Sequence, residues 1–241
     1  MISITDIEAI NLRCSRRSYT DVKIDEVELR KIKNLIDEYN KKEGLSIRFA
    51  LDGAEAFTGF NSYGMFSGVR SLIILSGKKS IENLKEKLGF YGELLVLEAT
   101  KLNLGTCFVA GSFNKKKLNI LSDEEELVSV ITIGNVPEDK AFREKFILSL
   151  IHRKSKDLKE FYEAEEKVPD WFINGVKAIQ RAPSAANRQP VKLKYDKGDV
   201  TAFVEKTDHL QLVDLGIAKA NFSLAVGGHF EFGNFGKFVK A

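Results

Sequence analysis

A cluster of basic and hydroxyl side chains lies near the start of the chain, in residues 13–18 (RCSRRS). Arg13 and Arg17 are four positions apart with Ser15 between them, so the three side chains could converge on one phosphate group. Guanidinium groups bind phosphate oxygens in a bidentate manner, and a serine hydroxyl adds a short hydrogen bond. A solvated, charged helix end would have the same composition, so the cluster alone is a weak indication of a site.

A second polar group lies in residues 182–190 (APSAANRQP). Pro183 and Pro190 bracket small residues and stiffen the segment, while Asn187 and Gln189 add two side-chain amides. A rigid loop with outward hydrogen-bonding groups suits a flat heteroaromatic ligand. A plain connection between a helix and a strand would explain the prolines but not the pair of amides.

A third segment, residues 103–113 (NLGTCFVAGSF), has glycines on both sides of a short apolar run. Glycine lets the backbone approach a ligand closely, so the amides of Ala110 and Gly111 could lie against a ring. A helix end followed by a core strand is at least as good an interpretation of this segment alone.

Together the three segments resemble the nitroreductase family of FMN-dependent oxidoreductases. Residues 13–19 (RCSRRSY) resemble the family's Arg-x-Ser-x-Arg/Lys phosphate motif, and residues 182–190 resemble its Ala-Pro-Ser-x-x-Asn-x-Gln-Pro flavin loop, which is the most specific match. Residues 104–108 (LGTCF) and 133–138 (IGNVPE) are similar to its Leu-Gly-x-x-Trp and Ile-Gly-Tyr-Pro-like segments. The resemblance covers most of the chain, and residues 182–190 are called the flavin loop below.

The order of these motifs departs from the common family pattern, in which the flavin loop follows the first pair of helices. Residues 40–45 occupy that place here, and the loop lies in the second half of the chain. Family members bind FMN at a homodimer interface, so the resemblance implies a fused pseudo-dimer whose first half supplies the arginines and whose second half supplies the loop. The second half has no arginine cluster before Trp171, and we expect one FMN site per chain.

The resemblance implies a set of cofactor-binding residues and no catalytic side chain. The set is Arg13, Cys14, Ser15, Arg17, Ala110, Gly111, Arg153, Pro183, Ser184, Asn187 and Gln189. The arginines and Ser15 would hold the phosphate, with Cys14 as a buried bystander, and the flavin loop would contact ribityl and ring atoms. Solvent exposure is an equally good interpretation of Arg153. Val191 stands where the family often has Trp after Gln-Pro.

The implied activity is that of an NAD(P)H oxidoreductase working by alternating half-reactions. NADH or NADPH would reduce FMN by hydride transfer to its N5 atom, and a nitroaromatic or quinone-like small molecule would then accept the electrons. The flavin carries the chemistry, so the protein mainly orients it and tunes its electronics. The alternatives are a non-catalytic flavin-binding protein for storage or sensing, and a scaffold that has lost flavin.

Composition excludes several other classes of protein. The 241 residues are 44% hydrophobic and 29% charged, an ordinary globular balance, and the net charge of +3 gives no general case for nucleic acid binding. Two cysteines are too few for a disulfide framework, and the three histidines show no metal-ligand spacing. Neither a signal peptide nor an apolar run of about 20 residues occurs. We expect a cytoplasmic protein without a membrane partner, and a monomer because the pseudo-dimer contact is internal.

Two nucleotide-binding motifs are also disfavoured. Residues 77–80 (GKKS) lack the glycine that a P-loop needs five positions before its lysine, since Ile73 stands there, and Ser80 is better interpreted as a helix N-cap. No Gly-x-Gly-x-x-Gly occurs, which disfavours a dinucleotide-binding Rossmann fold.

The periodicity of apolar residues and the resemblance together predict an α+β, nitroreductase-like fold. Two tandem half-repeats would form the pseudo-dimer, with central antiparallel or mixed sheets flanked by helices. The first half is expected over residues 1–150, a linker over 151–168 and a shorter second half over 169–241. Helices are predicted over residues 5–12, 26–43, 91–104, 171–181 and 212–226, and strands over 46–51, 72–75, 106–110, 127–133, 191–195, 200–205 and 229–232.

Overall fold

The structure is a computed structural model that describes residues 4–57, 65–118, 122–139 and 155–241. The chain divides into two compact units, each assembled from separate stretches of sequence. The arginine unit comprises Arg13–Leu84 and Leu95–Ile151. The loop unit comprises Met1–Leu12, Lys85–Leu94 and His152–Ala241, and contains the flavin loop.

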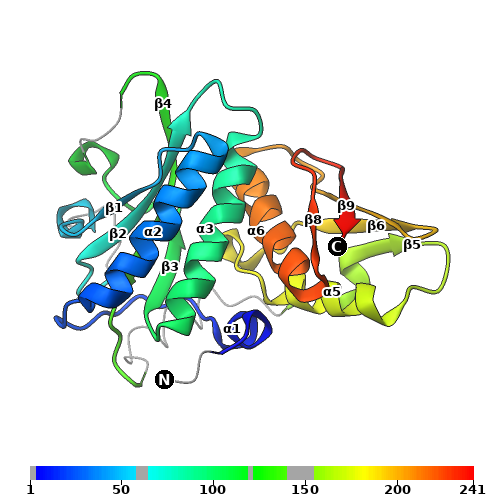
Figure 1. The fold of residues 1–241 in the computed structure, drawn as a ribbon, viewed down its shortest axis with the longest axis horizontal. Helices are drawn as coiled ribbons and strands as arrows, with labels where there is room; N and C mark the ends of the chain where they lie inside the picture. Colours follow the sequence, from blue (N-terminus) through cyan, green and yellow to red (C-terminus); the bar gives the residue numbers. More distant parts are fainter. Residues whose placement is uncertain (1–3, 58–64, 119–121, 140–154) are drawn as a thin grey trace. The chain divides into compact units, whose positions relative to one another are not determined.

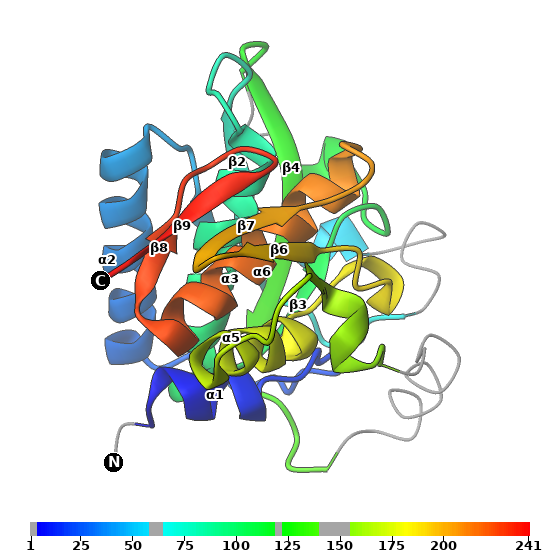
Figure 2. The same ribbon diagram turned by 90° about the vertical axis from the view of Figure 1, so that its right-hand side faces the viewer.

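The arginine unit is built on a four-stranded antiparallel sheet with the order β1-β2-β4-β3. Its strands are β1 (Arg48–Ala50), β2 (Ser71–Lys78), β3 (Gly105–Val109) and β4 (Glu125–Gly134). Both central strands are almost wholly buried, as their continuous apolar runs require. Helix α2 (Glu26–Glu43) covers one face of this sheet (Figures 1 and 2). The short helical turns η1 (Ala54–Phe57) and η3 (Lys115–Leu118) contribute to an apolar cluster with residues of β2 and β4.

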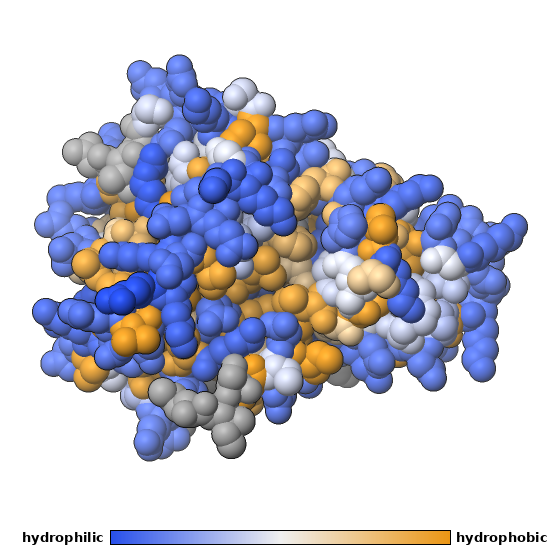
Figure 3. Space-filling view, viewed as in Figure 1, coloured by the Kyte–Doolittle hydropathy of each residue, from blue (hydrophilic) through white to orange (hydrophobic). Residues whose placement is uncertain are grey.

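Helix α2 has the bounds that its capping residues predict. The Asp25 side chain accepts a hydrogen bond from the backbone nitrogen of Val27 at 2.8 Å, and Gly44 ends the helix with φ +69°. Ile32 and Ile36 are buried, whereas hydrophilic residues cover most of the outward face of the helix (Figure 3). The amphipathic pattern of α2 therefore explains which face of the helix packs against the sheet.

The loop unit is built on a five-stranded sheet with the order β5-β6-β7-β9-β8. Strand β5 (Tyr162–Ala164) is parallel to β6 (Lys192–Asp196), and the pairs that join β7 (Asp199–Phe203), β9 (Gly236–Lys240) and β8 (Gly228–Phe230) are antiparallel. Helix α5 (Asp170–Arg181) and helix α6 (His209–Val226) supply the apolar side that packs against this sheet, and Figure 2 shows the sheet in front of α6.

A glycine sets the close packing of these two helices. A Cβ atom added at Gly175 of α5 would lie 2.2 Å from the ring of Phe222 on α6, so only glycine fits there. Helix α1 (Asp6–Leu12) belongs to the same unit and begins with the predicted capping box, because Thr5 and Glu8 exchange hydrogen bonds.

Some elements differ from the sequence prediction. Helix α3 (Leu84–Lys101) begins seven residues earlier than expected, because its first turns are charged and lack an apolar run, and Ser80 lies in a turn rather than at the N-cap. The predicted linker contains β5 and η4 (Leu158–Phe161), and β9 was not predicted. An α+β fold with helices and mixed sheets is confirmed, whereas the tandem repeat stays a prediction. In the described part of the chain, no helix combines the length and apolar character that crossing a bilayer requires.

Candidate functional site

The arginine segment, residues 13–19, is extended and is not the end of a helix. Helix α1 stops at Leu12, and Ser15 then forms a parallel bridge with Thr106 at the start of β3. A second parallel bridge joins Ser18 to Ser67. The backbone nitrogen of Arg16 donates to the Thr106 carbonyl at 2.8 Å. The solvated helix end considered from the sequence is therefore wrong.

An extended backbone sends alternate side chains to opposite sides, and from Ser15 to Ser18 the burial follows this alternation. Arg16 is 9% exposed and Ser18 is 8% exposed, so these two side chains point inward. Arg13, Ser15 and Arg17 alternate with them and are half-buried. Ser15 and Arg17 therefore share one side of the segment, and the same alternation assigns Arg13 to that side.

The inward side chains anchor the segment within the arginine unit. Arg16 donates through Nη2 to the carbonyl of Pro137 at 2.9 Å and packs against Gly105, where no Cβ would fit. The Tyr19 hydroxyl lies 2.6 Å from Oγ1 of Thr132 and donates to the Arg16 carbonyl at 2.8 Å. The sequence did not separate Arg16 from its neighbours. No local pattern in the sequence separates it from Arg13 and Arg17, because its burial depends on the pairing of Ser15 with Thr106.

Three other predicted residues belong to the arginine unit, namely Cys14, Ala110 and Gly111. Cys14 is half-buried, and neither it nor Cys107 forms a disulfide. Ala110 and Gly111 directly follow β3, the strand whose Thr106 pairs with Ser15. Gly111 is exposed, and an added Cβ there would meet nothing within 4 Å, so internal packing does not require this glycine. Arg153 lies outside the described residues.

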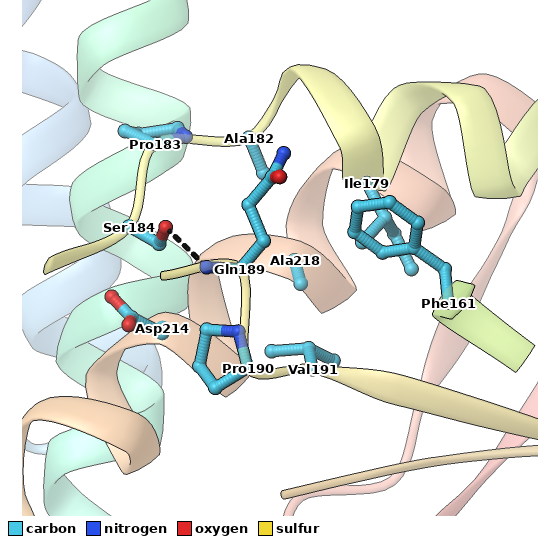
Figure 4. Close-up of a pocket in the computed structure, with 10 residues that line it drawn as sticks. All are labelled: Phe161, Ile179, Ala182, Pro183, Ser184, Gln189, Pro190, Val191, Asp214 and Ala218. Atoms are coloured by element: carbon cyan, nitrogen blue, oxygen red, sulfur yellow. Dashed lines mark hydrogen bonds between the residues drawn. The ribbon is translucent and has the colours of Figure 1, made fainter. Parts of the chain in front are cut away.

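The flavin loop follows the end of α5 in a strained conformation. Ala186, Asn187 and Gln189 have φ angles of 51°, 50° and 48°, in the left-handed region that non-glycine residues rarely adopt. Each such residue costs about 1 kcal/mol or more and persists only where the surroundings hold it. Ser184 closes the loop, because its Oγ accepts a hydrogen bond from the backbone nitrogen of Gln189 at 2.9 Å (Figure 4).

Hydrogen bonds of Gln189 hold the end of the flavin loop in place. Its side chain is 4% exposed, its Oε1 accepts from the backbone nitrogen of Lys156 at 2.9 Å, and its Nε2 donates to the carbonyl of Gln180 at 2.9 Å. Lys156 Nζ also donates to the Gln189 carbonyl at 2.9 Å. The amide therefore ties the loop to the end of α5 and to the segment before η4. Pro183, Ser184 and Asn187 are half-buried, and direct cofactor contacts for all four loop residues stay predictions.

Asp214 of α6 is a candidate that the sequence reasoning missed. The residue is 6% exposed, and its carboxyl group accepts hydrogen bonds from the backbone nitrogen of Ala185, at 3.1 Å to Oδ1 and 3.3 Å to Oδ2. Burial raises the pKa of the Asp214 carboxyl group to about 7. Asp214 lines a small cavity with Pro183, Ser184 and Gln189 (Figure 4). An acidic residue inside an apolar helix was the available signal.

Comparison with known proteins identifies the family. The model of the family described as "Putative TM nitroreductase" matches residues 6–226. The crystal structure of a putative nitroreductase from Thermotoga maritima MSB8 is 24% identical with a TM-score of 0.66, over 99% of this chain and 94% of that chain. The crystal structure of a nitroreductase family protein from Clostridium difficile 630 is 18% identical with a TM-score of 0.50, over 67% of this chain and 98% of that chain. These likenesses show a shared fold.

A comparison with curated proteins gave no match. The family match nevertheless extends from the first turn of α1 to the last residue of α6, and so includes both the arginine segment and the flavin loop. The chain therefore belongs to the nitroreductase family that this model describes.

Proposed function

We propose that this chain is an FMN-dependent NAD(P)H oxidoreductase of the nitroreductase type. The observation that carries the proposal is the placement of Arg13, Ser15 and Arg17 on one side of an extended segment, with Arg16 turned inward. Family membership supports the oxidoreductase class, and the arginine segment supports a cofactor with a phosphate group.

The donor set fits the phosphate of FMN. Two guanidinium groups and one hydroxyl provide several N–H and O–H donors and two positive charges for a dianion. The backbone hydrogen bonds of Arg16 and Tyr19 fix the segment, so the donors need little ordering when the phosphate binds. The backbone at Gly111 is exposed and an added Cβ would meet nothing within 4 Å, which is compatible with the cofactor edge proposed there.

Each residue has a binding or orienting role in this proposal. Arg13 and Arg17 neutralise the phosphate, and Ser15 donates a hydrogen bond to it. Pro183, Ser184, Asn187 and Gln189 shape the loop that contacts ribityl and ring atoms, either directly or by holding its backbone. When bound, FMN would supply hydride transfer from NADH or NADPH to a nitroaromatic or quinone-like acceptor. No side chain of the chain is assigned as a proton donor or acceptor in this reaction.

We further propose one FMN per chain and a monomeric, cytoplasmic protein that binds neither nucleic acid nor membrane. A fused pseudo-dimer would carry its family's dimer contact internally, and only the arginine segment matches the phosphate motif. Flavin absorbance against protein concentration measures the stoichiometry. A ratio near two would contradict the single-site proposal.

The absorption spectrum of the purified protein is the first test. We expect a flavin spectrum that NADH or NADPH bleaches without oxygen and that a nitroaromatic or quinone restores. Bound FMN that neither donor reduces would instead indicate the storage or sensing protein considered from the sequence. Colourless protein that does not bind added FMN would refute the proposal.

A further inference from the structure

The flavin loop needs a contact that holds its left-handed residues in place. Ala186 and Asn187 are two successive non-glycine residues with positive φ, at 51° and 50°. The hydrogen bond from Gln189 N to Ser184 Oγ closes the loop on itself, and the Gln189 amide fixes its end. Within the loop, the backbone nitrogens of Asn187 and Arg188 donate to the carbonyls of Ser184 and Ala185 at 3.0 and 3.1 Å, and these bonds engage the carbonyl of Ala185 but not its N–H group.

Asp214 provides the contact at that entry point. Both of its carboxyl oxygens accept from the backbone nitrogen of Ala185, at 3.1 and 3.3 Å, across 29 residues of sequence. Asp214 is only 6% exposed, although burying an acid is costly without strong hydrogen bonds. Figure 4 shows Asp214 projecting from α6 toward the loop, beside Pro190 and below Ser184. The N–H group of Ala185, which donates to both carboxyl oxygens, offsets part of this cost.

We propose that Asp214 is a positioning residue for the flavin loop, and that its carboxyl group holds Ala185 so that the turn at Ala186 and Asn187 keeps the conformation that contacts the flavin. The part of this inference that concerns flavin rests on the proposed function. The part that concerns the loop rests on the contacts of Asp214 alone.

The charged groups around Asp214 give the loop a dependence on pH. Burial raises the Asp214 pKa to about 7, the Ala185 N–H group lowers it, Asp208 at the N-cap of α6 raises it, and Arg188 in the loop lowers it. Lys219, also on α6, is paired with Glu86. An opened loop would expose Asp214 to water and return its pKa toward 3.8.

The packed and opened loops bind different numbers of protons, and this difference decides whether loop opening becomes easier or harder as the pH rises. Between pH 3.8 and about 7 the packed loop keeps a proton that the opened loop releases. Opening therefore becomes easier as the pH rises through this window, by up to about tenfold per pH unit, and is constant above it.

Amide hydrogen exchange of residues 185–189 tests the loop directly, after correction for intrinsic exchange. In the wild-type protein the equilibrium constant for loop opening should increase from pH 5 to pH 7. Asp214→Asn keeps an acceptor and loses the charge, so its opening should not vary with pH. At pH 4, where Asp214 is protonated in the packed loop, Asp214→Ala should raise opening by at least about tenfold because the acceptor for Ala185 N is lost. Wild-type protection in Asp214→Ala, or an equal pH slope in Asp214→Asn, would overturn the proposal.

FMN affinity, measured by the quenching of flavin fluorescence, tests the connection to the cofactor. Asp214→Ala should weaken binding by about tenfold or more, whereas Asp214→Asn should stay within about threefold of wild type. Asp208→Ala is the matched control, because it removes the exposed N-cap of the same helix, which accepts from Gln211 N at 2.9 Å, and should also stay within about threefold.

Hydrogen exchange and FMN affinity together distinguish a failure of the role of Asp214 from a failure of the proposed function. If the wild-type protein binds FMN and Asp214→Ala binds it equally well, the role of Asp214 is refuted and the proposed function stands. If the wild-type protein binds no FMN, the proposed function is refuted, and the exchange data decide whether Asp214 positions the loop.

Discussion

Breaking the buried ion pair of Lys219 and Glu86 should strongly destabilise the loop unit. Lys219 Nζ lies 2.5 Å from Glu86 Oε1, with side chains 0% and 1% exposed. The same Nζ donates to the carbonyls of Glu231 at 2.9 Å and Gly233 at 2.8 Å, and Glu86 Oε2 accepts from Gly233 N at 2.7 Å. The pair therefore ties the segment between β8 and β9 to α6 and to the first part of α3.

The perturbation is Lys219→Met, which keeps the length of the side chain and removes its charge. It leaves a buried carboxylate without its cation and two carbonyls without a donor, which should lower the free energy of unfolding by about 4 kcal/mol. Glu86→Gln removes the other charge. If the two charges act on each other, the double variant should lose about 2 kcal/mol less than the sum of the single losses.

Urea unfolding followed by Trp171 fluorescence is the assay. Trp171 is the only tryptophan in the sequence and belongs to the loop unit, so its signal reports on that unit. Lys192→Met is the matched control, because Lys192 and Glu205 pair at a similar distance of 2.8 Å, but their side chains are 31% and 67% exposed. It should cost less than about 1 kcal/mol. Equal losses for Lys192→Met and Lys219→Met, or additive losses in the cycle, would refute the reasoning.

Three further predictions concern the binding segments and the core. The double change Arg13→Ala and Arg17→Ala should weaken FMN binding by about a hundredfold or more, since two charge-assisted contacts to phosphate are lost, and unchanged affinity in a fluorescence titration would mean that the phosphate site is misplaced. Asp214→Asn should stabilise the protein by up to about 4 kcal/mol at pH 7 and above, and by less at lower pH. The reason is that the raised pKa of Asp214 lowers the stability of the wild-type protein as the pH rises from 3.8 to about 7. Urea unfolding of both proteins at pH 5 and pH 7.5 checks this. Gly175→Ala should cost about 2 kcal/mol in the same assay because its Cβ would overlap a phenylalanine ring of α6, whereas Gly111→Ala, which meets nothing, should leave stability unchanged.

The sequence by itself determined the features that depend on neighbouring residues. Asp25 and Gly44 fix the ends of α2, and Thr5 and Glu8 form the capping box of α1, because capping hydrogen bonds reach only a few residues along the chain. The buried strands β2 and β4 could also be predicted, because each contains a continuous apolar run in the sequence. The family resemblance rested on short motifs, which are also local.

Only the tertiary structure decided which side chains the candidate segments turn outward. Arg13, Arg16 and Arg17 are chemically equivalent in the sequence, and the bridge from Ser15 to Thr106 across the fold turns Arg16 inward. The parallel pairing of β5 with β6 likewise joins segments that are far apart in the chain, so no local pattern marked β5 as a strand.

Asp214 shows the same division between local and long-range information. Its position in an apolar helix could be read from the sequence, but its acceptance of the Ala185 N–H group spans 29 residues. Burial and that backbone contact are the largest causes of its shifted pKa, and both exist only once α6 and the flavin loop have packed together. Side-chain types were thus fixed by the sequence, while their environment, and with it their chemistry, was fixed by packing between distant segments.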